Sequence, residues 1–408
     1  MKKVFFVALA ALAVGFLPAA HADGQRILTI VGEQTRTSVP VEISPWFDKV
    51  AGRDRAQAYE TIISLGFSDR QAADYVCPGL GRTIAEIFLE EERPARDATL
   101  RFDANNVLCP FEYRPHTVGK SVNKAKFRRD FADFLSGKTN EIRLEILKVQ
   151  PRTTTASLVG RTKLLGTYKT DFSRSGTGRR QNVLHAAGFL NGKVIMPGQV
   201  ASFNEMVGPR TAERGFAEAN VIVGGRYVPG IGGGVCQVST TLYNAVIRAG
   251  LCVREVRNHS LAPTYVPPSL DAMVSESSDF KFVNNTGAPV YIVADAQDGV
   301  LQFWLYGREE RNYRTEYESR IVAMIEPPPS VKVLDETLPD GAVVIERALQ
   351  GVESEAYEIR IFADGTKESV LIRRDKYKAK GEIVRHGKIT DESGGERLIS
   401  GKVSPQSG

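Results

Sequence analysis

The sequence predicts an α+β protein in which a β-rich central domain contains one buried helix that begins at a cysteine. Its 408 residues are enough for several domains with hydrophobic cores. A glycine-rich loop at residues 229–234 runs directly into a segment with helical apolar spacing, which stops at Gly250. Around this segment, short β-branched and aromatic runs are separated by turn residues. Before residue 158, helical and strand-like segments alternate, which is typical of a mixed α/β domain.

The first residues have the pattern of a secretory signal peptide. Two lysines precede an apolar run at residues 4–17, and the small-x-small site Ala20-His21-Ala22 follows. The run is shorter than the roughly 20 residues that a membrane-spanning helix needs, so a cleaved signal at residues 1–22 is favoured over an uncleaved anchor. No later stretch is apolar for long enough to span a bilayer. We therefore expect an exported protein, in a periplasm or cell envelope.

Charge and composition argue against a nucleic-acid partner. The formal net charge is +5, from 53 lysine and arginine residues against 48 acidic residues. This modest excess fits weak attraction to an anionic polymer such as a cell envelope. The sequence contains no basic run with interleaved aromatic residues, a pattern that would favour nucleic-acid binding.

Residues 23–157 are expected to form the first, α+β domain. Its acidic run at residues 90–92 is interpreted as solvated surface, because no acid pair or metal-ligand cluster accompanies it. Strand composition occurs at 27–31, 98–102 and 141–149, and helical composition at 53–65, 69–76 and 124–135.

Residues 158–307 are expected to form the β-rich central domain and residues 308–390 a small all-β module. Residues 391–408 have the composition of a disordered tail. In the central domain, strands are expected at 163–172, 253–256, 271–274, 280–284, 290–293 and 301–306, with a short helix at 182–190.

Export affects how the four cysteines are interpreted, because oxidising compartments favour disulfides. Cys77 and Cys109 each precede a proline in the first domain, and we expect these two to pair. Cys236 and Cys252 are then either bonded to each other or separate. A helix of about 12 residues would hold them about 18 Å apart, beyond disulfide reach unless the chain folds back. The apolar neighbours of Cys252 favour a buried core thiol.

Cys236, at the start of the predicted helix, is the candidate nucleophile. Ser239 or Thr240 is expected to cap this helix, and the helix dipole lowers the pKa of a thiol placed there. His259, at the end of a predicted strand in the same domain, is the candidate base. Backbone N–H groups near Cys236 and Gln237 would form the oxyanion hole.

Two other interpretations of this region are weaker. A zinc site built from Cys236, Cys252 and His259 lacks the close-spaced ligand pairs that zinc sites have, so we expect no metal. A phosphate-binding loop is disfavoured because no Gly-Lys-Ser/Thr follows the glycines.

These residues carry a family resemblance. The run Gly-Gly-Gly-Val-Cys-Gln-Val-Ser-Thr-Thr-Leu-Tyr-Asn at residues 232–244 resembles the core motif of the VanW family. Further matching segments lie at residues 197–211, 258–267, 271–274 and 279–285, so that the resemblance covers about residues 165–307. The first domain is more weakly similar to the peptidoglycan-binding domain that often precedes VanW domains. The β module at residues 308–390 resembles a G-five domain, which is associated with wall glycans, through Gly341, Gly351, Tyr357 and residues 383–385.

The resemblance implies an atypical peptidoglycan L,D-transpeptidase that uses a cysteine and no cofactor. Cys236 matches the family cysteine and His259 the histidine of its Asn-His-Ser motif, while Asp271, Asp279 or a backbone carbonyl is left to orient that histidine. The implied partners are peptidoglycan stem peptides and glycan. The alternative is a non-catalytic wall-binding protein. Candidates for oxyanion or substrate positioning are Gly234, Gln237, Ser239, Ser260, Arg210 and Asp271.

Overall fold

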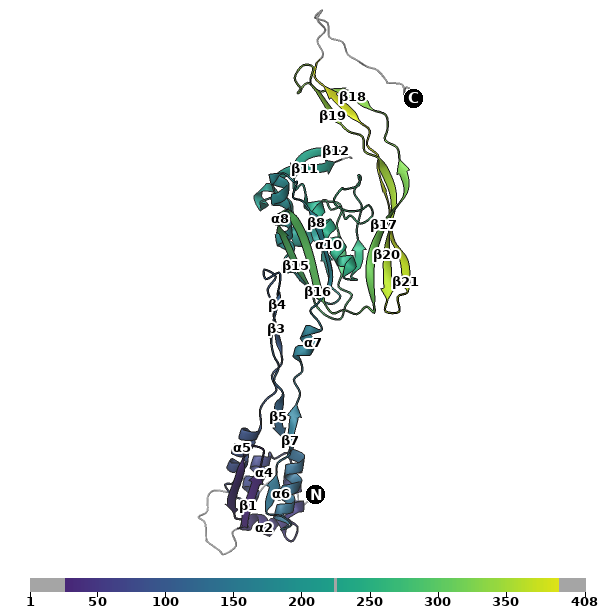
Figure 1. Cartoon of the computed structure of the whole chain (residues 1–408). Helices are drawn as coiled ribbons and strands as arrows, with labels where there is room; N and C mark the ends of the chain where they lie inside the picture. Colours follow the sequence, from purple (N-terminus) through teal and green to yellow (C-terminus); the bar gives the residue numbers. More distant parts are fainter. Residues whose placement is uncertain (1–25, 224–225, 389–408) are drawn as a thin grey trace, which may run out of the picture. The chain divides into compact units, whose positions relative to one another are not determined.

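The structure, a computed structural model, describes residues 26–223 and 226–388, which form two compact units (Figure 1). The first unit contains the described residues up to Thr99 and Tyr113–Thr155; the second contains Leu100–Glu112 and those from Ala156 onward. The α+β class is confirmed, since helices and strands build both units. No helix of the described residues is long and apolar enough to cross a membrane. The expected signal peptide and disordered tail lie outside the described residues.

Helices surround a small sheet in the first unit. Strand β1 pairs antiparallel with β2 and parallel with β6. Helix α6 buries Phe127, Phe131 and Phe134, as their spacing predicts. The expected strand at 141–149 is two strands, β6 and β7, and helix α5 was not predicted. The elements are β1 (Arg26–Val31), β2 (Arg36–Val41), α2 (Pro45–Ala51), α3 (Arg55–Ser64), α4 (Asp69–Val76), α5 (Leu80–Glu91), β5 (Gly119–Val122), α6 (Lys124–Leu135), β6 (Glu141–Arg143) and β7 (Ile146–Val149).

Glu91, at the end of α5, is 2% exposed, which corrects the expectation that the acidic run is solvated surface. Its carboxylate accepts backbone N–H groups from Glu33, Gln34 and Thr35 in the β1–β2 turn, and the Thr35 hydroxyl donates a fourth hydrogen bond. Burial raises the pKa of Glu91, but these hydrogen bonds outweigh burial and lower the pKa below its usual value. Glu91 therefore ties α5 to the β1–β2 hairpin.

The predicted disulfide does not form, since all four cysteines are free. Cys77 packs in the core of the first unit and is 1% exposed. Cys109 is exposed and belongs to the second unit, in the segment that connects β3 (Thr99–Phe102) to β4 (Phe111–Arg114). The proline after each of these two cysteines indicates a loop. It does not indicate to which unit that loop belongs. Cys252 is exposed at the start of an edge strand, so the expectation of a buried thiol was also wrong.

A four-stranded antiparallel sheet, in the order β8-β16-β15-β9, frames the second unit. Helices α8 and α10 pack on it, and the apolar side of α10 is buried in the main core. The elements up to residue 307 are α7 (Thr155–Val159), β8 (Lys163–Asp171), α8 (Thr177–Leu190), β9 (Val194–Ile195), β10 (Val200–Ser202), α9 (Phe203–Val207), the 3-10 turn η1 (Ala212–Arg214), β11 (Glu218–Val223), β12 (Arg226–Ile231), α10 (Val235–Arg248), β13 (Cys252–Glu255), β14 (Lys281–Val283), β15 (Val290–Gln297) and β16 (Val300–Gly307).

Helix α10 begins immediately after the glycine run. Its N-cap is Gly234, whose φ of 107° lies in the left-handed region that favours glycine. A Cβ on Gly233 would lie 2.6 Å from the carbonyl oxygen of Asn220, so that position also requires glycine. The predicted caps, Ser239 and Thr240, were wrong, because both lie inside the helix, beyond its first turn.

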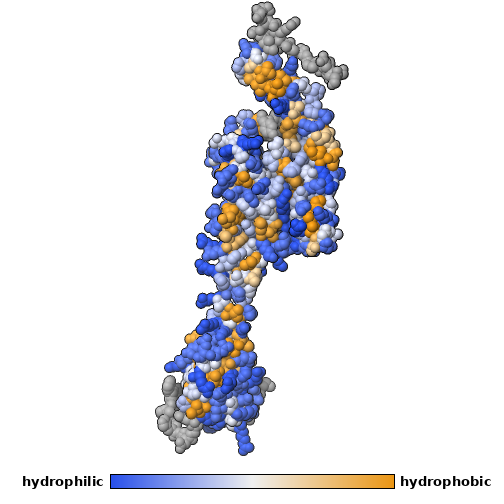
Figure 2. Space-filling model, viewed as in Figure 1, coloured by the Kyte–Doolittle hydropathy of each residue, from blue (hydrophilic) through white to orange (hydrophobic). Residues whose placement is uncertain are grey.

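The strands after residue 307 share a core with α10 and its sheet. The β17–β20–β21 sheet contributes Ala356 to the main core, and the Tyr317 hydroxyl donates to the carbonyl of Ile247 at 2.6 Å. Figure 2 shows hydrophobic residues gathered on the second sheet, β18–β22–β19, where Val331, Val343 and Ile345 are exposed. The strands are β17 (Tyr313–Ile325), β18 (Val331–Leu334), β19 (Val343–Glu346), β20 (Gly351–Phe362), β21 (Lys367–Tyr377) and β22 (Ile383–His386).

We predict that Glu91→Ala lowers the free energy of unfolding of the first unit by about 2–3 kcal/mol, because three backbone N–H groups lose a charged acceptor. Glu90→Ala is the matched control, since Glu90 is exposed and adjacent. Urea unfolding of the full chain measures both. Equal stabilities of the two variants would contradict the structural role of Glu91.

Candidate active site

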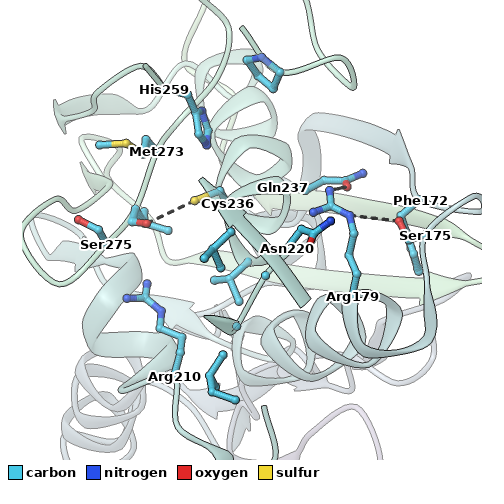
Figure 3. A pocket seen from close by; sticks show the side chains of 18 of the residues that line it. Phe172, Ser175, Arg179, Arg210, Asn220, Cys236, Gln237, His259, Met273 and Ser275 are labelled. Carbon is cyan, nitrogen blue, oxygen red and sulfur yellow. Dashed lines mark hydrogen bonds between the residues drawn. The ribbon is translucent and has the colours of Figure 1, made fainter. Parts of the chain in front are cut away.

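The second unit contains a pocket of about 1350 Å³ at the start of α10 (Figure 3). Cys236 and His259, the two principal candidates from the sequence, both line it. Arg210, Ser260 and Gly234 line it as well, so the structure brings most of the predicted site residues together. Ser239 does not line the pocket and is fully buried.

Polar side chains of α10 fix the segment 270–274 against the helix. The Ser239 hydroxyl and the Asn244 amide each donate to backbone carbonyls of this segment at 2.6 Å, and Thr240 Oγ1 accepts a backbone N–H at 3.0 Å. The predicted strand at 271–274 is absent from the structure, because these side chains take the backbone hydrogen bonds that a sheet would use. The buried polar positions of α10 thereby place Asp271 beside His259.

Asp271 is the acidic partner of His259. The Nδ1 of His259 lies 2.6 Å from Asp271 Oδ2, and the backbone N–H of His259 donates to the same oxygen at 2.7 Å. His259 is 5% exposed and Asp271 is fully buried. Of the three orienting groups that the sequence left open, Asp279 is engaged elsewhere, where it accepts from the Ser202 hydroxyl and the Asn204 N–H.

Because Nδ1 is held by Asp271, Nε2 is the nitrogen left for the thiol. Figure 3 shows the imidazole of His259 facing the sulfur of Cys236. Burial raises the pKa of Cys236, but the hydrogen bond and charge of His259, together with the charge of Arg210, outweigh burial and lower it. Burial lowers the pKa of His259, but Asp271 and Cys236 raise it to about 9. Both shifts stabilise the charged forms, so the arrangement favours a thiolate–imidazolium pair.

The thiol also lies close to backbone groups at the start of α10. Cys236 Sγ is 3.3 Å from the carbonyl oxygen of Val274 and can donate to it while protonated. The N–H groups of Val235 and Gln237 already bond to Gly232 and Gly234. Within the described residues, the N–H of Cys236 has no backbone acceptor, as expected in the first turn of a helix.

Two arginines flank the thiol. In Figure 3 the guanidinium groups of Arg179 and Arg210 lie on opposite sides of Cys236. Arg210 donates to Asn204 Oδ1, and its Nε is buried without a hydrogen-bond partner in the described part of the chain. Burial lowers the pKa of Arg210. A buried guanidinium nitrogen that lacks an acceptor is suited to an anionic ligand.

Gln237 also lines the pocket, but most of its side chain is engaged in hydrogen bonds inside the protein. Its side chain is 1% exposed and its amide nitrogen donates to Thr170 Oγ1 and to the carbonyl of Asp171, at 3.0 and 2.9 Å. Its amide oxygen accepts from Arg179 Nη2 at 2.6 Å. Gln237 thus connects α10 to β8 and orients Arg179.

Sequence reasoning missed Arg179. It also missed Tyr377 and Arg373, two residues of β21 that contact Asp271. Arg179 follows a Ser-Gly-Thr-Gly run near the start of α8 and lies before the helix predicted at 182–190. Tyr377 donates to Asp271 across 106 residues of sequence, and no local pattern predicts such a contact.

A family model matches the part of the chain that contains Cys236, His259 and Asp271. Residues 178–306 match a family model described as VanW like protein. The chain is also 35% identical over 203 residues to the uncharacterized protein YoaR of Bacillus subtilis (strain 168). That alignment covers 49% of this chain and 67% of YoaR. The family match contains both flanking arginines and the Cys236–His259–Asp271 group, and it ends before β17.

We predict that iodoacetamide alkylates Cys236 at lower pH than it alkylates an ordinary thiol, because the His259 imidazolium, whose pKa is about 9, lowers the pKa of the thiol. The acid limb of the pH profile is the range over which the alkylation rate rises as the thiol loses its proton. In His259→Ala this limb moves toward the ordinary thiol pKa of about 8.5, and the rate at pH 6 falls by about tenfold or more. Mass spectrometry follows the modification, with the exposed Cys252 as internal comparison. An unchanged limb in His259→Ala would refute the ion pair.

Proposed function

This chain belongs to the VanW family, and we propose that it is a cysteine-dependent acyltransferase of peptidoglycan, of the L,D-transpeptidase type. The observation that supports the proposal is the Cys236–His259–Asp271 arrangement at the wall of a pocket of about 1350 Å³. A nucleophile, a base and an acid that orients the base are the parts that acyl transfer requires. The pocket exceeds the volume of most small-molecule sites, which favours a peptide substrate.

In the first step, the Cys236 thiolate attacks the carbonyl carbon of the bond between the L-centre and the terminal D-residue of a donor stem peptide. The tetrahedral oxyanion forms beside the unengaged N–H of Cys236 at the positive end of α10. The His259 imidazolium then protonates the leaving amine as the C–N bond breaks. The D-amino acid departs, and the acyl group remains on sulfur as a thioester.

In the second step, the side-chain amine of diaminopimelate on a neighbouring stem attacks the thioester. Neutral His259 accepts the proton that this amine loses, and the C–S bond breaks to return the thiolate. The new amide is a cross-link between two stems. Asp271 keeps its charge throughout, because His259 and Arg373 hold its pKa below the usual range despite burial. No metal or organic cofactor takes part in either step.

Arg210 and Arg179 are the proposed contacts for carboxylates of the donor. A stem peptide that ends in a D-amino acid carries one carboxylate on the leaving residue and others on the acyl part. The two guanidinium groups lie on opposite sides of Cys236, so each can bind on one side of the scissile carbonyl. Arg210 is the stronger candidate, since its buried Nε lacks an acceptor, whereas Arg179 already bonds Ser175 and Gln237.

We further propose that the protein is exported and acts at the cell wall. The first unit and residues 308–388 then serve as contacts to peptidoglycan and its glycan, on the ground of their sequence resemblance. Ser260, which lines the pocket next to His259, remains a candidate for substrate contact.

Incubation with a tetrapeptide-stem muropeptide is predicted to add the donor minus one D-amino acid to Cys236, and to yield cross-linked dimers. Cys236→Ala is expected to lower dimer formation by about 10³-fold or more, because the nucleophile is lost. Cys252→Ala, the matched control, is expected to behave as wild type because that thiol is exposed and outside the pocket. Intact-protein and product mass spectrometry give both readouts. Binding of the muropeptide without adduct or dimer would instead support a non-catalytic wall-binding protein.

The role of Arg210 predicts a charge preference at the thiol. The rate of Cys236 alkylation by iodoacetate, divided by the rate with neutral iodoacetamide, is expected to fall about 3- to 10-fold in Arg210→Gln, because a nearby positive charge is removed. The ratio cancels any change in thiolate population, since both reagents require the thiolate. Arg180→Gln is the control, because Arg180 is exposed on α8 and does not line the pocket. An equal ratio in both variants would remove Arg210 from anion binding.

A further inference from the structure

We propose that the β17–β20–β21 sheet is part of the catalytic unit, and that Tyr377 and Arg373 on β21 are positioning residues that hold Asp271 against His259. The inference rests on the proposed function, because it assigns these residues to the same acyl-transfer site. It also adds an active-site role to residues 308–388, for which the proposed function gives only wall contacts.

Tyr377 is bonded directly to the carboxylate. Its hydroxyl donates to Asp271 Oδ1 at 2.5 Å and accepts the backbone N–H of Ser269 at 2.6 Å. The Tyr377 side chain is fully buried. A single hydroxyl thus bridges the carboxylate and the backbone two residues before it, which restricts both the position of Asp271 and the rotation of its carboxylate.

Arg373, on the same strand β21, also contacts Asp271. Its Nη1 donates to the backbone carbonyl of Asp271 at 2.6 Å, and its Nη2 lies 3.5 Å from Oδ1. Its Nε donates to Asp375 at 2.7 Å, and its guanidinium is 5.7 Å from the ring centre of Tyr243 on α10. Arg373 therefore supplies positive charge next to a carboxylate that no water reaches.

The strand also holds the residues on either side of His259. The backbone N–H of Lys378 donates to the carbonyl of Ser260 at 2.8 Å, and the Asn258 amide donates to the carbonyl of Lys376 at 3.0 Å. The end of β21 therefore contacts both members of the histidine–carboxylate pair, or their direct neighbours.

The two carboxylate oxygens of Asp271 have different partners, and this difference distinguishes a positioning role of the sheet from a packing role. Oδ2 is occupied by His259, so Oδ1 needs its own donors to replace lost hydration, and Tyr377 and Arg373 are those donors. A sheet that served only as packing would be satisfied by Phe and Met at these two positions. Two polar side chains that converge on one buried atom indicate that the sheet fixes the carboxylate.

The test is a double-mutant cycle on the full chain, with the pH dependence of Cys236 alkylation by iodoacetamide as readout. This readout requires no peptidoglycan, so it can fail or succeed independently of the transpeptidase assay. Tyr377→Phe is expected to lower the rate at pH 7 by about 3- to 10-fold and to move the acid limb upward, because a less ordered Asp271 supports the imidazolium less well. In an Asp271→Asn background the same substitution is expected to have no further effect.

Two control variants separate positioning from general loosening. Ser354→Ala removes a hydroxyl that pairs with Ser269 at 2.7 Å in the same interface without touching Asp271, and Tyr357→Phe removes a hydroxyl bonded to Glu355 on the same sheet. Both are expected to retain the wild-type pH profile. Near-UV circular dichroism verifies folding of each protein.

If Tyr377→Phe does not fold, Arg373→Lys replaces it in the cycle. Lysine keeps the positive charge but cannot contact Asp271 through two nitrogens, so this substitution is expected to shift the acid limb in the same direction. The proposal is overturned by a wild-type profile in the folded variant, by an undiminished effect in the Asp271→Asn background, or by an equal shift in Ser354→Ala.

Discussion

The Asp271 carboxylate is fully buried, and a charge in such a position is stable only where protein groups replace the lost hydration. Three parts of the second unit meet this demand. Helix α10 fixes the backbone of segment 270–274, His259 satisfies Oδ2, and β21 satisfies Oδ1. Because each contact constrains the same few atoms, the position of the imidazole, and through it the charge on Cys236, follows from how this one carboxylate is held.

The two charges at the pocket depend on each other. Burial alone would keep Cys236 protonated and His259 neutral, since desolvation disfavours either charged form. Together, each charge offsets the burial cost of the other, and Asp271 adds a fixed negative charge behind the imidazole. A nucleophile that exists only as half of a pair titrates with the pair.

Local patterns predicted local features, and distant partners escaped them. The helix at 235–248 and its cysteine follow from glycine spacing and apolar period, and His259 followed from its place at the end of a predicted strand in the same domain. Asp271 was one of three possible orienting groups, because an aspartate in an irregular segment has no periodic signature. Tyr377 lies on another sheet, and Glu91 is buried by a turn some 56–58 residues away. Such contacts arise from tertiary packing, which a single sequence does not display.

The buried polar residues of α10 lower the intrinsic stability of this helix, and their contacts explain why they stand there. Ser239, Thr240 and Asn244 are weaker helix formers than leucine or alanine, and an apolar side chain at each position would suit a buried helix better. Their positions suit this site because segment 270–274 is irregular, so its backbone groups have no sheet partners, and these side chains satisfy them. The family match ends at residue 306, yet the carboxylate that this segment carries is completed by β21. The physical unit that holds this carboxylate is therefore longer than the segment that the family model matches.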